Sequence, residues 1–439
     1  MLAGCSLFVD TSGLSESSEP ALDSSTGDSG DASNGSDAPI EVNEGGALLE
    51  SHLIASVGSI PAETGMAQQQ HLVYATNSAR WWFFFMVDSQ PTSLDAAWST
   101  DFATWNTAAT RPLSTSMSGE GRNFSVSYAN RNNVDVVQGV FSHFLGTSEE
   151  VRHARATIQG ATINYETGSL LTAATPVDAL ANPDGCVTAT ASDGFVYDAS
   201  GWFNQKPTTG VDTIGREDLF QSSTADLGAA TWTSSLPHDF SAAATGYVHN
   251  RALIPISAGG MLALWPTAET PADTGNVNAA LGSPLSINVF SGGTGTAKQA
   301  TNDWNACALT PTDVHAVRRL LDGGKNDLFE HVRRNASDGT WSAGGAITPD
   351  PGKYGSGVVL FSDGKQLLML TIANDPSNSI RSTKWNGTAW SAWRTVVGSS
   401  ATRAYLSGTG CNSTRAGVVW TEGSSAPYRA VGMEVSSLF

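Results

Sequence analysis

Three side chains that can take part in acid–base chemistry or bind an anion stand close together in the middle of the chain: Tyr247, His249 and Arg251. In an extended segment their two-residue spacing places them on one face, because successive side chains of a strand point to opposite faces. Tyrosine and histidine are common general acids and bases. We take the three as the candidate catalytic residues; the alternative is that they are solvated residues on an exposed strand.

A second group of histidines and arginines lies earlier, at His143, Arg152, His153 and Arg155, and carries the same two interpretations. The sequence has no Ser-His-Asp motif, nucleophile elbow, phosphate-binding loop or EF-hand loop. Its Cys and His residues also lack the spacing of a zinc site. We therefore expect neither a metal nor a cofactor.

Two tryptophans, Trp202 and Trp265, stand just before the longest expected connections, 204–218 and 266–284. A tryptophan ring can cover the C–H face of a sugar, and His249 and Arg251 are expected near by. These four residues form the candidate ligand-binding set. The alternative for both tryptophans is packing at the rim of the fold.

The elements that must position these residues are short strands. Beyond residue 46, runs rich in Val, Ile, Thr and aromatic residues alternate with turn-forming residues, which is typical of antiparallel strands. A turn followed by Trp recurs at Trp105, Trp232, Trp341 and Trp390, and units begin near residues 70, 123, 184, 246, 304, 353 and 404. This repeat indicates an all-β fold over 47–439, a β-propeller. We expect seven four-stranded blades; six or eight blades, or a pair of β-sandwich domains, are the alternatives.

The last unit offers about three strands before the sequence ends. The run 47–55 could supply the missing outer strand, so we expect an N-terminal strand to close the ring. The repeated tryptophans are expected to pack between neighbouring blades rather than to bind a ligand.

The first part of the chain differs in composition. Residues 6–46 are dominated by Ser, Gly, Asp, Glu and Ala, and the first fifty residues hold ten of the 41 acidic residues and none of the 23 Lys and Arg residues. Such a segment has too little apolar surface to fold, so it predicts a disordered acidic linker. The net charge of −18 repels phosphates and argues against a nucleic-acid partner.

Residues Leu2-Ala3-Gly4-Cys5 resemble the lipobox of bacterial lipoproteins. The resemblance implies a signal-peptide remnant over 1–5, a diacylated Cys5, and a secreted, surface-exposed protein anchored in the cell envelope, at the outer membrane. Because Met1 directly precedes the motif, we expect the true start to lie upstream. No apolar run reaches the roughly 18 residues of a membrane-spanning helix, so attachment by lipid alone is expected.

The remaining cysteines are Cys186, Cys307 and Cys411, one near the start of the third, fifth and seventh units. Units so placed are not neighbours, which makes disulfide reach doubtful. We expect small buried thiols.

Two motifs resemble known propeller repeats. Ser99-Thr100-Asp101-Phe102-Ala103-Thr104-Trp105 resembles the Asp-box of sialidase-type propellers, and Lys384-Trp385-Asn386-Gly387-Thr388-Ala389-Trp390-Ser391-Ala392-Trp393 resembles the repeats of propeller lectins that bind fucose-like sugars. A sialidase also needs three arginines and an Arg-Ile-Pro motif, to which Arg251-Ala252-Leu253-Ile254-Pro255 is only distantly similar.

Propeller polysaccharide lyases use a His/Tyr base and acid with an arginine that neutralises a uronate, and this resemblance would give Tyr247, His249 and Arg251 those roles. With no complete catalytic set, we expect a lipid-anchored surface propeller that binds a glycan or a protein partner without catalysis. The alternatives are a carbohydrate-active enzyme on the same fold, either a polysaccharide lyase or a sialidase-like glycosidase, and a structural scaffold in a surface complex.

Overall fold

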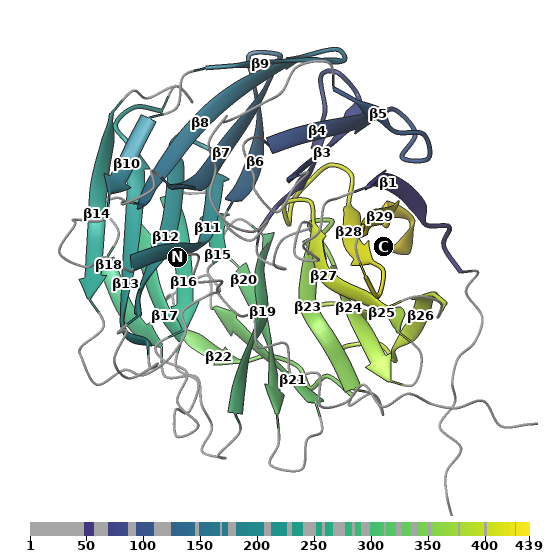
Figure 1. Ribbon diagram of the computed structural model, residues 1–439. Helices are drawn as coiled ribbons and strands as arrows, with labels where there is room; N and C mark the ends of the chain where they lie inside the picture. The colour runs from purple at the N-terminus through teal and green to yellow at the C-terminus, as the bar shows by residue number, and fades with distance from the viewer. Residues whose placement is uncertain are drawn as a thin grey trace, which may run out of the picture. The chain divides into compact units, whose positions relative to one another are not determined.

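A computed structural model describes the chain in segments between Leu48 and Phe439 (Figure 1). The described segments are 48–56, 69–86, 94–108, 124–144, 149–166, 169–173, 181–205, 212–225, 231–239, 252–256, 260–266, 277–282, 286–290, 299–310, 313–321, 327–334, 340–348, 353–375, 378–398, 402–425 and 427–439. The linker expected over 6–46 and Cys5 lie outside them. The pattern of backbone contacts divides the chain into two units, residues 1–42 and residues 43–439.

The first half of the folded part contains the following strands. They are β1 (His52–Ser56), β2 (Leu72–Ala75), β3 (Arg80–Met86), β4 (Leu94–Ser99), β5 (Asn106–Thr107), β6 (Phe124–Arg131), β7 (Val134–Phe144), β8 (Glu149–Gln159), β9 (Thr162–Tyr165), β10 (Ser169–Ala173), β11 (Ala181–Thr190), β12 (Val196–Gln205), β13 (Asp212–Ser222) and β14 (Trp232–Asp239).

The second half continues in the same manner and ends in one short helix. Its elements are β15 (Ala252–Ile256), β16 (Gly260–Pro266), β17 (Val277–Gly282), β18 (Ser286–Phe290), β19 (Gln299–Thr310), β20 (Asp313–Leu321), β21 (Asp327–Arg334), β22 (Trp341–Ala343), β23 (Lys353–Ser362), β24 (Leu367–Asp375), β25 (Ser379–Trp385), β26 (Arg394–Val397), β27 (Arg403–Gly408), β28 (Gly417–Glu422), β29 (Arg429–Glu434) and the 3-10 helix η3 (Ser436–Leu438). Among the described residues, no helix has the length and apolar character needed to cross a bilayer.

The described strands form seven antiparallel sheets, five of which are meanders of four strands in chain order. Five of them are β2–β5, β11–β14, β15–β18, β19–β22 and β23–β26; a sixth, β6–β10, has a fifth strand, and the last joins β27, β28 and β29 to β1. The first strands of successive sheets contact one another in the order β2, β6, β11, β15, β19, β23 and β27, and β2 also contacts β28. The sheets therefore follow one another in a closed ring, which confirms the all-β propeller.

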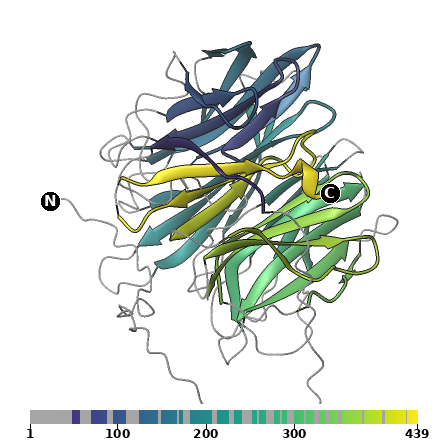
Figure 2. The ribbon, with the colours of Figure 1, turned by 90° about the vertical axis from the view of Figure 1, so that its right-hand side faces the viewer.

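The ring is closed by its two ends. β1 pairs antiparallel with β29, with His52 opposite Gly432 and Ser56 opposite Arg429. Figure 2 shows β1 beside the C-terminal strands. The expected N-terminal closing strand is thereby confirmed, and its pairing supplies the outer strand that the last unit lacks.

Apolar clusters fill six of the junctions between adjacent sheets. Their largest fully buried side chains include Trp81, Trp82 and Trp420. Burial of this apolar surface is the main force that holds sheet to sheet, since neighbouring sheets share no backbone ladder. The seventh junction, between the β6–β10 and β11–β14 sheets, has only two small apolar clusters and differs in character.

The turns that precede the repeated tryptophans are built on one side-chain oxygen. Asp101 Oδ1 accepts the backbone N–H groups of Ala103 and Thr104 at 2.9 and 2.8 Å, and Trp105 Nε1 donates to the carbonyl of Phe102 at 2.8 Å. Asn386 Oδ1 plays the same part before Trp390, accepting from the backbones of residues 388 and 389 at 2.9 Å each. These short-range bonds fix each turn and aim the indole that follows.

The indoles then pack against a neighbouring sheet, as expected. Trp390 is buried, and its ring centroid lies 5.3 Å from that of His331 on β21 of the preceding sheet. Trp232 lies 4.5 Å from His153 on β8, again in the preceding sheet. The packing role of these two tryptophans is confirmed.

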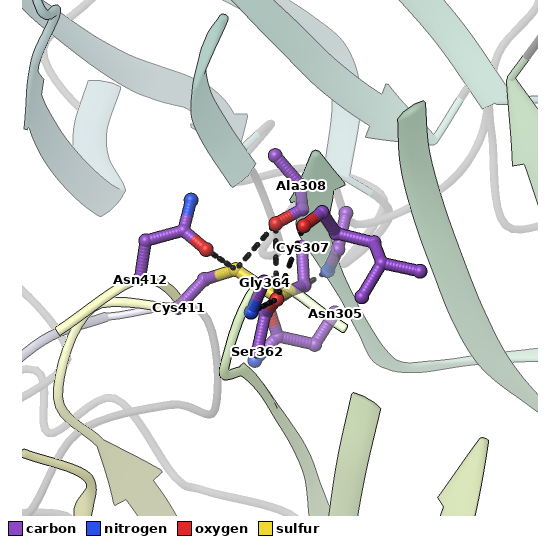
Figure 3. The surroundings of a disulfide bond; sticks show 9 residues. Asn305, Cys307, Ala308, Ser362, Gly364, Cys411 and Asn412 are labelled. Carbon is purple, nitrogen blue, oxygen red and sulfur yellow. Dashed lines mark hydrogen bonds between the residues drawn. A yellow bond between two sulfur atoms is a disulfide. The ribbon is translucent and has the colours of Figure 1, made fainter. Parts of the chain in front are cut away.

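The expectation for the cysteines is wrong for two of the three. Cys307 on β19 and Cys411 just after β27 form a disulfide with a Cα–Cα distance of 5.4 Å (Figure 3). The β23–β26 sheet lies between their sheets in the ring. The first strands of all sheets line the same ring axis. Residues at the ends of these strands can therefore come into contact even when another sheet lies between their own sheets in the ring. Cys186 is a buried free thiol, as predicted.

Candidate functional site

A polar junction stands where the β6–β10 and β11–β14 sheets meet. Its buried polar side chains are Ser125, Ser127, Gln138, Ser142, His153, Thr188, Asp198, Ser200 and Asp218. Strand register explains the set, because Thr188 lies opposite Asp198 and Ser200 opposite Asp218, so all four share one face of the β11–β14 sheet. Polar residues recur at every second position on this face, where other junctions carry Val, Leu or aromatic residues.

His153 is the centre of the polar junction. Its Nδ1 donates to Asp198 Oδ2 at 2.7 Å across the junction, and its Nε2 lies 2.9 Å from Gln138 Oε1 in its own sheet. The ring also contacts Trp232. Both ring nitrogens are therefore engaged, and the imidazole is held in one orientation by two hydrogen bonds and an indole.

Three buried oxygens of the junction have no hydrogen-bond partner within the described part of the chain. They are Asp198 Oδ1, Ser200 Oγ and Thr188 Oγ1, all on the same face of the β11–β14 sheet. Leaving a buried carboxylate oxygen or hydroxyl without a partner costs free energy. These three oxygens are therefore an uncompensated cost within the described part of the polar junction.

The arginines of β8 (Glu149–Gln159) are paired with carboxylates, and Arg152 and Glu150 lie on the face of β8 opposite to His153. Arg152 Nε donates to Glu150 Oε2 at 2.8 Å, and Arg155 lies 3.5 Å from Glu166. Both arginines are partly exposed, with Arg152 at 32% and Arg155 at 24% of their side-chain surface. The second His/Arg group of the sequence is thus split: its arginines reach solvent, but His153 is buried, so the solvated-strand interpretation is wrong for His153.

The other sequence-predicted residues are placed only in part. Tyr247, His249 and Arg251 lie outside the described segments. Trp202 lies on β12 opposite Pro183 and Arg216, and Trp265 lies on β16 opposite Asn278. Both tryptophans stand near strand ends, but β13 begins at Asp212 and β17 at Val277, so the expectation of connections over 204–218 and 266–284 is wrong in length.

A second buried polar cluster joins the β19–β22 sheet to the β23–β26 sheet. His331 Nδ1 accepts hydrogen bonds from the backbone N–H of Gly345 at 2.9 Å and from Trp390 Nε1 at 3.1 Å. The proton of the neutral ring must then be on Nε2, which donates to His315 Nδ1 at 2.8 Å. These contacts fix one tautomer for each ring.

The remaining nitrogen of His315 faces a charged pair. His315 Nε2 lies 3.4 Å from Asp313 Oδ2, and Arg333 binds both oxygens of that carboxylate, at 2.9 and 3.0 Å. Burial lowers the pKa of His315 and lowers that of His331 to about 3. Burial raises the pKa of Asp313, but the hydrogen bonds and positive charge of Arg333, with the contact from His315, outweigh burial and leave that pKa low. Both rings are therefore neutral at physiological pH, and the cluster acts as a structural link between sheets.

Sequence reasoning missed Gln138 and Asp198, the two partners of His153. The available signal was the alternation of polar residues along single segments, such as Thr188 with Thr190 and Asp198 with Ser200. Within the described segments, no group of three or more His, Cys, Asp or Glu side chains is placed to hold a metal ion.

No family model and no curated protein matches this sequence. Solved structures do resemble it in fold. An ulvan lyase from a polysaccharide lyase family, bound to -[GlcA(1-4)Rha3S]-, has a TM-score of 0.58 at 11% identity over 86% of this chain and 94% of its own.

Two further structures are more distant. A Hadza microbial sialidase has a TM-score of 0.41 at 12% identity, covering 79% of this chain and 74% of its own. A lectin from Aleuria aurantia in complex with α-methyl-L-fucoside has a TM-score of 0.41 at 11% identity, covering 72% and 95%. What this chain shares with the lyase structure is the β-propeller fold.

Proposed function

We propose that this protein is a lipid-anchored cell-surface propeller that binds carbohydrate without cleaving it. The anchor is a diacylated Cys5, and the linker over 6–46 holds the propeller away from a bacterial outer membrane. A surface protein partner is the other occupant to be tested. The proposal depends most on one observation: His153 and Asp198, at the centre of the polar junction, are engaged with each other.

A general base needs a free nitrogen or oxygen within hydrogen-bond reach of the substrate. His153 has none, because Asp198 and Gln138 occupy both ring nitrogens. A histidine whose two ring nitrogens are already bound is poorly placed to accept a proton from a ligand, so binding without catalysis is favoured.

The carbohydrate class is proposed by analogy of fold and from the two tryptophans near the strand ends. The lyase structure of the same fold holds a saccharide, which makes a saccharide the first ligand to test here. We propose that Trp202 and Trp265, with His249 and Arg251, line the binding face at the connections that follow β12 and β16.

A second candidate function is a carbohydrate-active enzyme, either a polysaccharide lyase or a sialidase-like glycosidase. One observation favours it: Asp198 and His153 form a buried acid–imidazole pair, an arrangement common in catalytic sites. A substrate hydroxyl that displaced Gln138 would free Nε2 as a base. Tyr247, His249 and Arg251 are the alternative catalytic residues for that function.

The experiment is a panel of acidic and neutral polysaccharides, assayed for binding and for depolymerisation with the same protein. Binding without new reducing ends or unsaturated products supports the proposal. Cleavage that is lost in His153→Ala or His249→Ala would establish the enzyme instead. For the anchor, mass spectrometry of protein expressed with its upstream sequence should find diacylated Cys5; an unmodified Cys5 would exclude the anchor.

A further inference from the structure

A cavity of about 660 Å³ lies where the turns after the first strands of several sheets meet. Its walls come from Ser192 after β11, Pro255 on β15, Thr310 on β19, Asp363 after β23 and Asn412 after β27. Five sheets thus contribute to one opening. The volume falls in the range of about 300–1,000 Å³ that is usual for small-molecule sites.

These turns lie at the opposite ends of the strands from the connections that carry the proposed glycan-binding face. In each sheet the first and second strands are joined at one end and the second and third at the other, because all neighbours are antiparallel. The cavity is therefore a separate site from the one proposed above.

The rim of the cavity is held by covalent and hydrogen bonds (Figure 3). The Cys307–Cys411 disulfide ties β19 to the turn after β27. Ser362 links the turn between them to both neighbours, since its backbone N–H donates to the Cys411 carbonyl at 3.0 Å and its hydroxyl to the Leu309 carbonyl at 3.4 Å. A rim fixed in advance loses little conformational entropy when a ligand binds.

The lining combines polar edges with an apolar floor. Thr310, Asn412 and Thr414 are exposed at the mouth, whereas Leu309 and Ala416 are buried. Phe439 adds a half-buried aromatic ring to the lining. Hydroxyl and amide groups around an apolar surface complement a sugar, which has hydroxyl edges and C–H faces.

The charge of the lining limits the ligand further. Asp363 is the charged side chain among the described lining residues, and its Oδ1 already accepts the backbone N–H groups of Lys365 and Gln366, at 2.8 and 2.7 Å. None of those described lining residues is a lysine or an arginine that could pair with an anionic ligand. A uronate or a sulfated sugar would meet one carboxylate and no counter-charge, so an uncharged ligand is favoured.

We propose that this cavity is a second binding site, which takes one neutral monosaccharide unit. Thr310 and Asn412 bond its hydroxyls, and Phe439 covers a C–H face. For a ligand of this size, efficiency limits predict a dissociation constant of about 1 mM.

The test titrates the full chain with D-glucose, D-galactose, L-fucose and D-glucuronate, followed by saturation-transfer NMR and calorimetry. At least one neutral sugar should bind with saturation, and Thr310→Val and Asn412→Ala should each weaken it about tenfold through the loss of a hydrogen bond. Thr104→Val is the matched control, because Thr104 is an exposed threonine in a turn of another sheet and lies outside the cavity lining. It should leave the affinity unchanged.

The proposal is overturned if no neutral sugar saturates, if glucuronate binds as well as the neutral sugars, or if Thr310→Val and Asn412→Ala bind like the wild type. Thermal melts of each variant separate lost binding from lost folding, and Thr310→Val, at an exposed position, should melt like the wild type. Polysaccharide binding at the other face should persist in both cavity variants, so failure of one site is distinguishable from failure of the other.

Discussion

Replacing both Cys307 and Cys411 by alanine should lower the free energy of unfolding substantially. The disulfide joins residues separated by 104 positions, and a loop of that length corresponds to about 4.7 kcal/mol of lost chain entropy in the unfolded state. This value is an upper figure, because compact unfolded chains lose less. Alanine in place of the Cys307 sulfur removes little volume, so most of the effect should come from the lost cross-link.

The assay is urea unfolding of the oxidised wild type, the reduced wild type and the double alanine variant, all carrying Cys5→Ser. The reduced protein and the variant should share a lower midpoint, while Cys186→Ala, which touches no cross-link, should shift the midpoint much less. Thiol titration of the denatured oxidised protein should find one free thiol. Three free thiols, or a variant as stable as the oxidised wild type, would refute the reasoning.

Three further predictions concern the buried polar clusters and the turns. Asp198→Ala leaves His153 buried without its carboxylate partner and should lower the free energy of unfolding in urea by about 3–5 kcal/mol. A decrease below about 1 kcal/mol would show that the His153–Asp198 pair contributes little to stability. Burial lowers the pKa of His331 to about 3, so the unfolded chain, with a pKa near 6.5, binds the proton first as pH falls. Stability should therefore be full above pH 6.5 and fall toward pH 3, and His331→Leu should flatten this slope; a variant with an unchanged slope contradicts the assignment. Hydrogen bonds from the backbone of Thr104 and from neighbouring groups lower the pKa of Asp101. The turn should therefore be stabilised above the ordinary carboxyl pKa and weaken in acid, which NMR of the Trp105 indole should report. Asp101→Asn should show no such acid response.

Much of the fold was predictable because its signals are local. Alternating apolar residues specify strands, and turns with Asn, Asp and Gly specify hairpins. The turn before Trp390, for example, can be recognised from the five consecutive residues that begin at Asn386. The closing strand was predictable from the short last unit. Each of these features needs only neighbouring residues to be recognised.

The disulfide and the polar junction were not predictable in the same way. Cys307 meets Cys411 because of the ring's geometry, which no local pattern encodes. His153 was noticed in the sequence, but Asp198 lies 45 residues away on another sheet. Which residues pair across a junction depends on how adjacent sheets face each other, and this is set by the packing of the whole ring.

The central claim is that the propeller binds carbohydrate and leaves it intact. The most direct measurement incubates the wild-type protein with a polysaccharide that it retains in affinity electrophoresis, and follows the chain length of that polysaccharide by size-exclusion chromatography. The account predicts retention with no change in chain length. A fall in chain length that disappears in His153→Ala or His249→Ala, with folding intact, would contradict it.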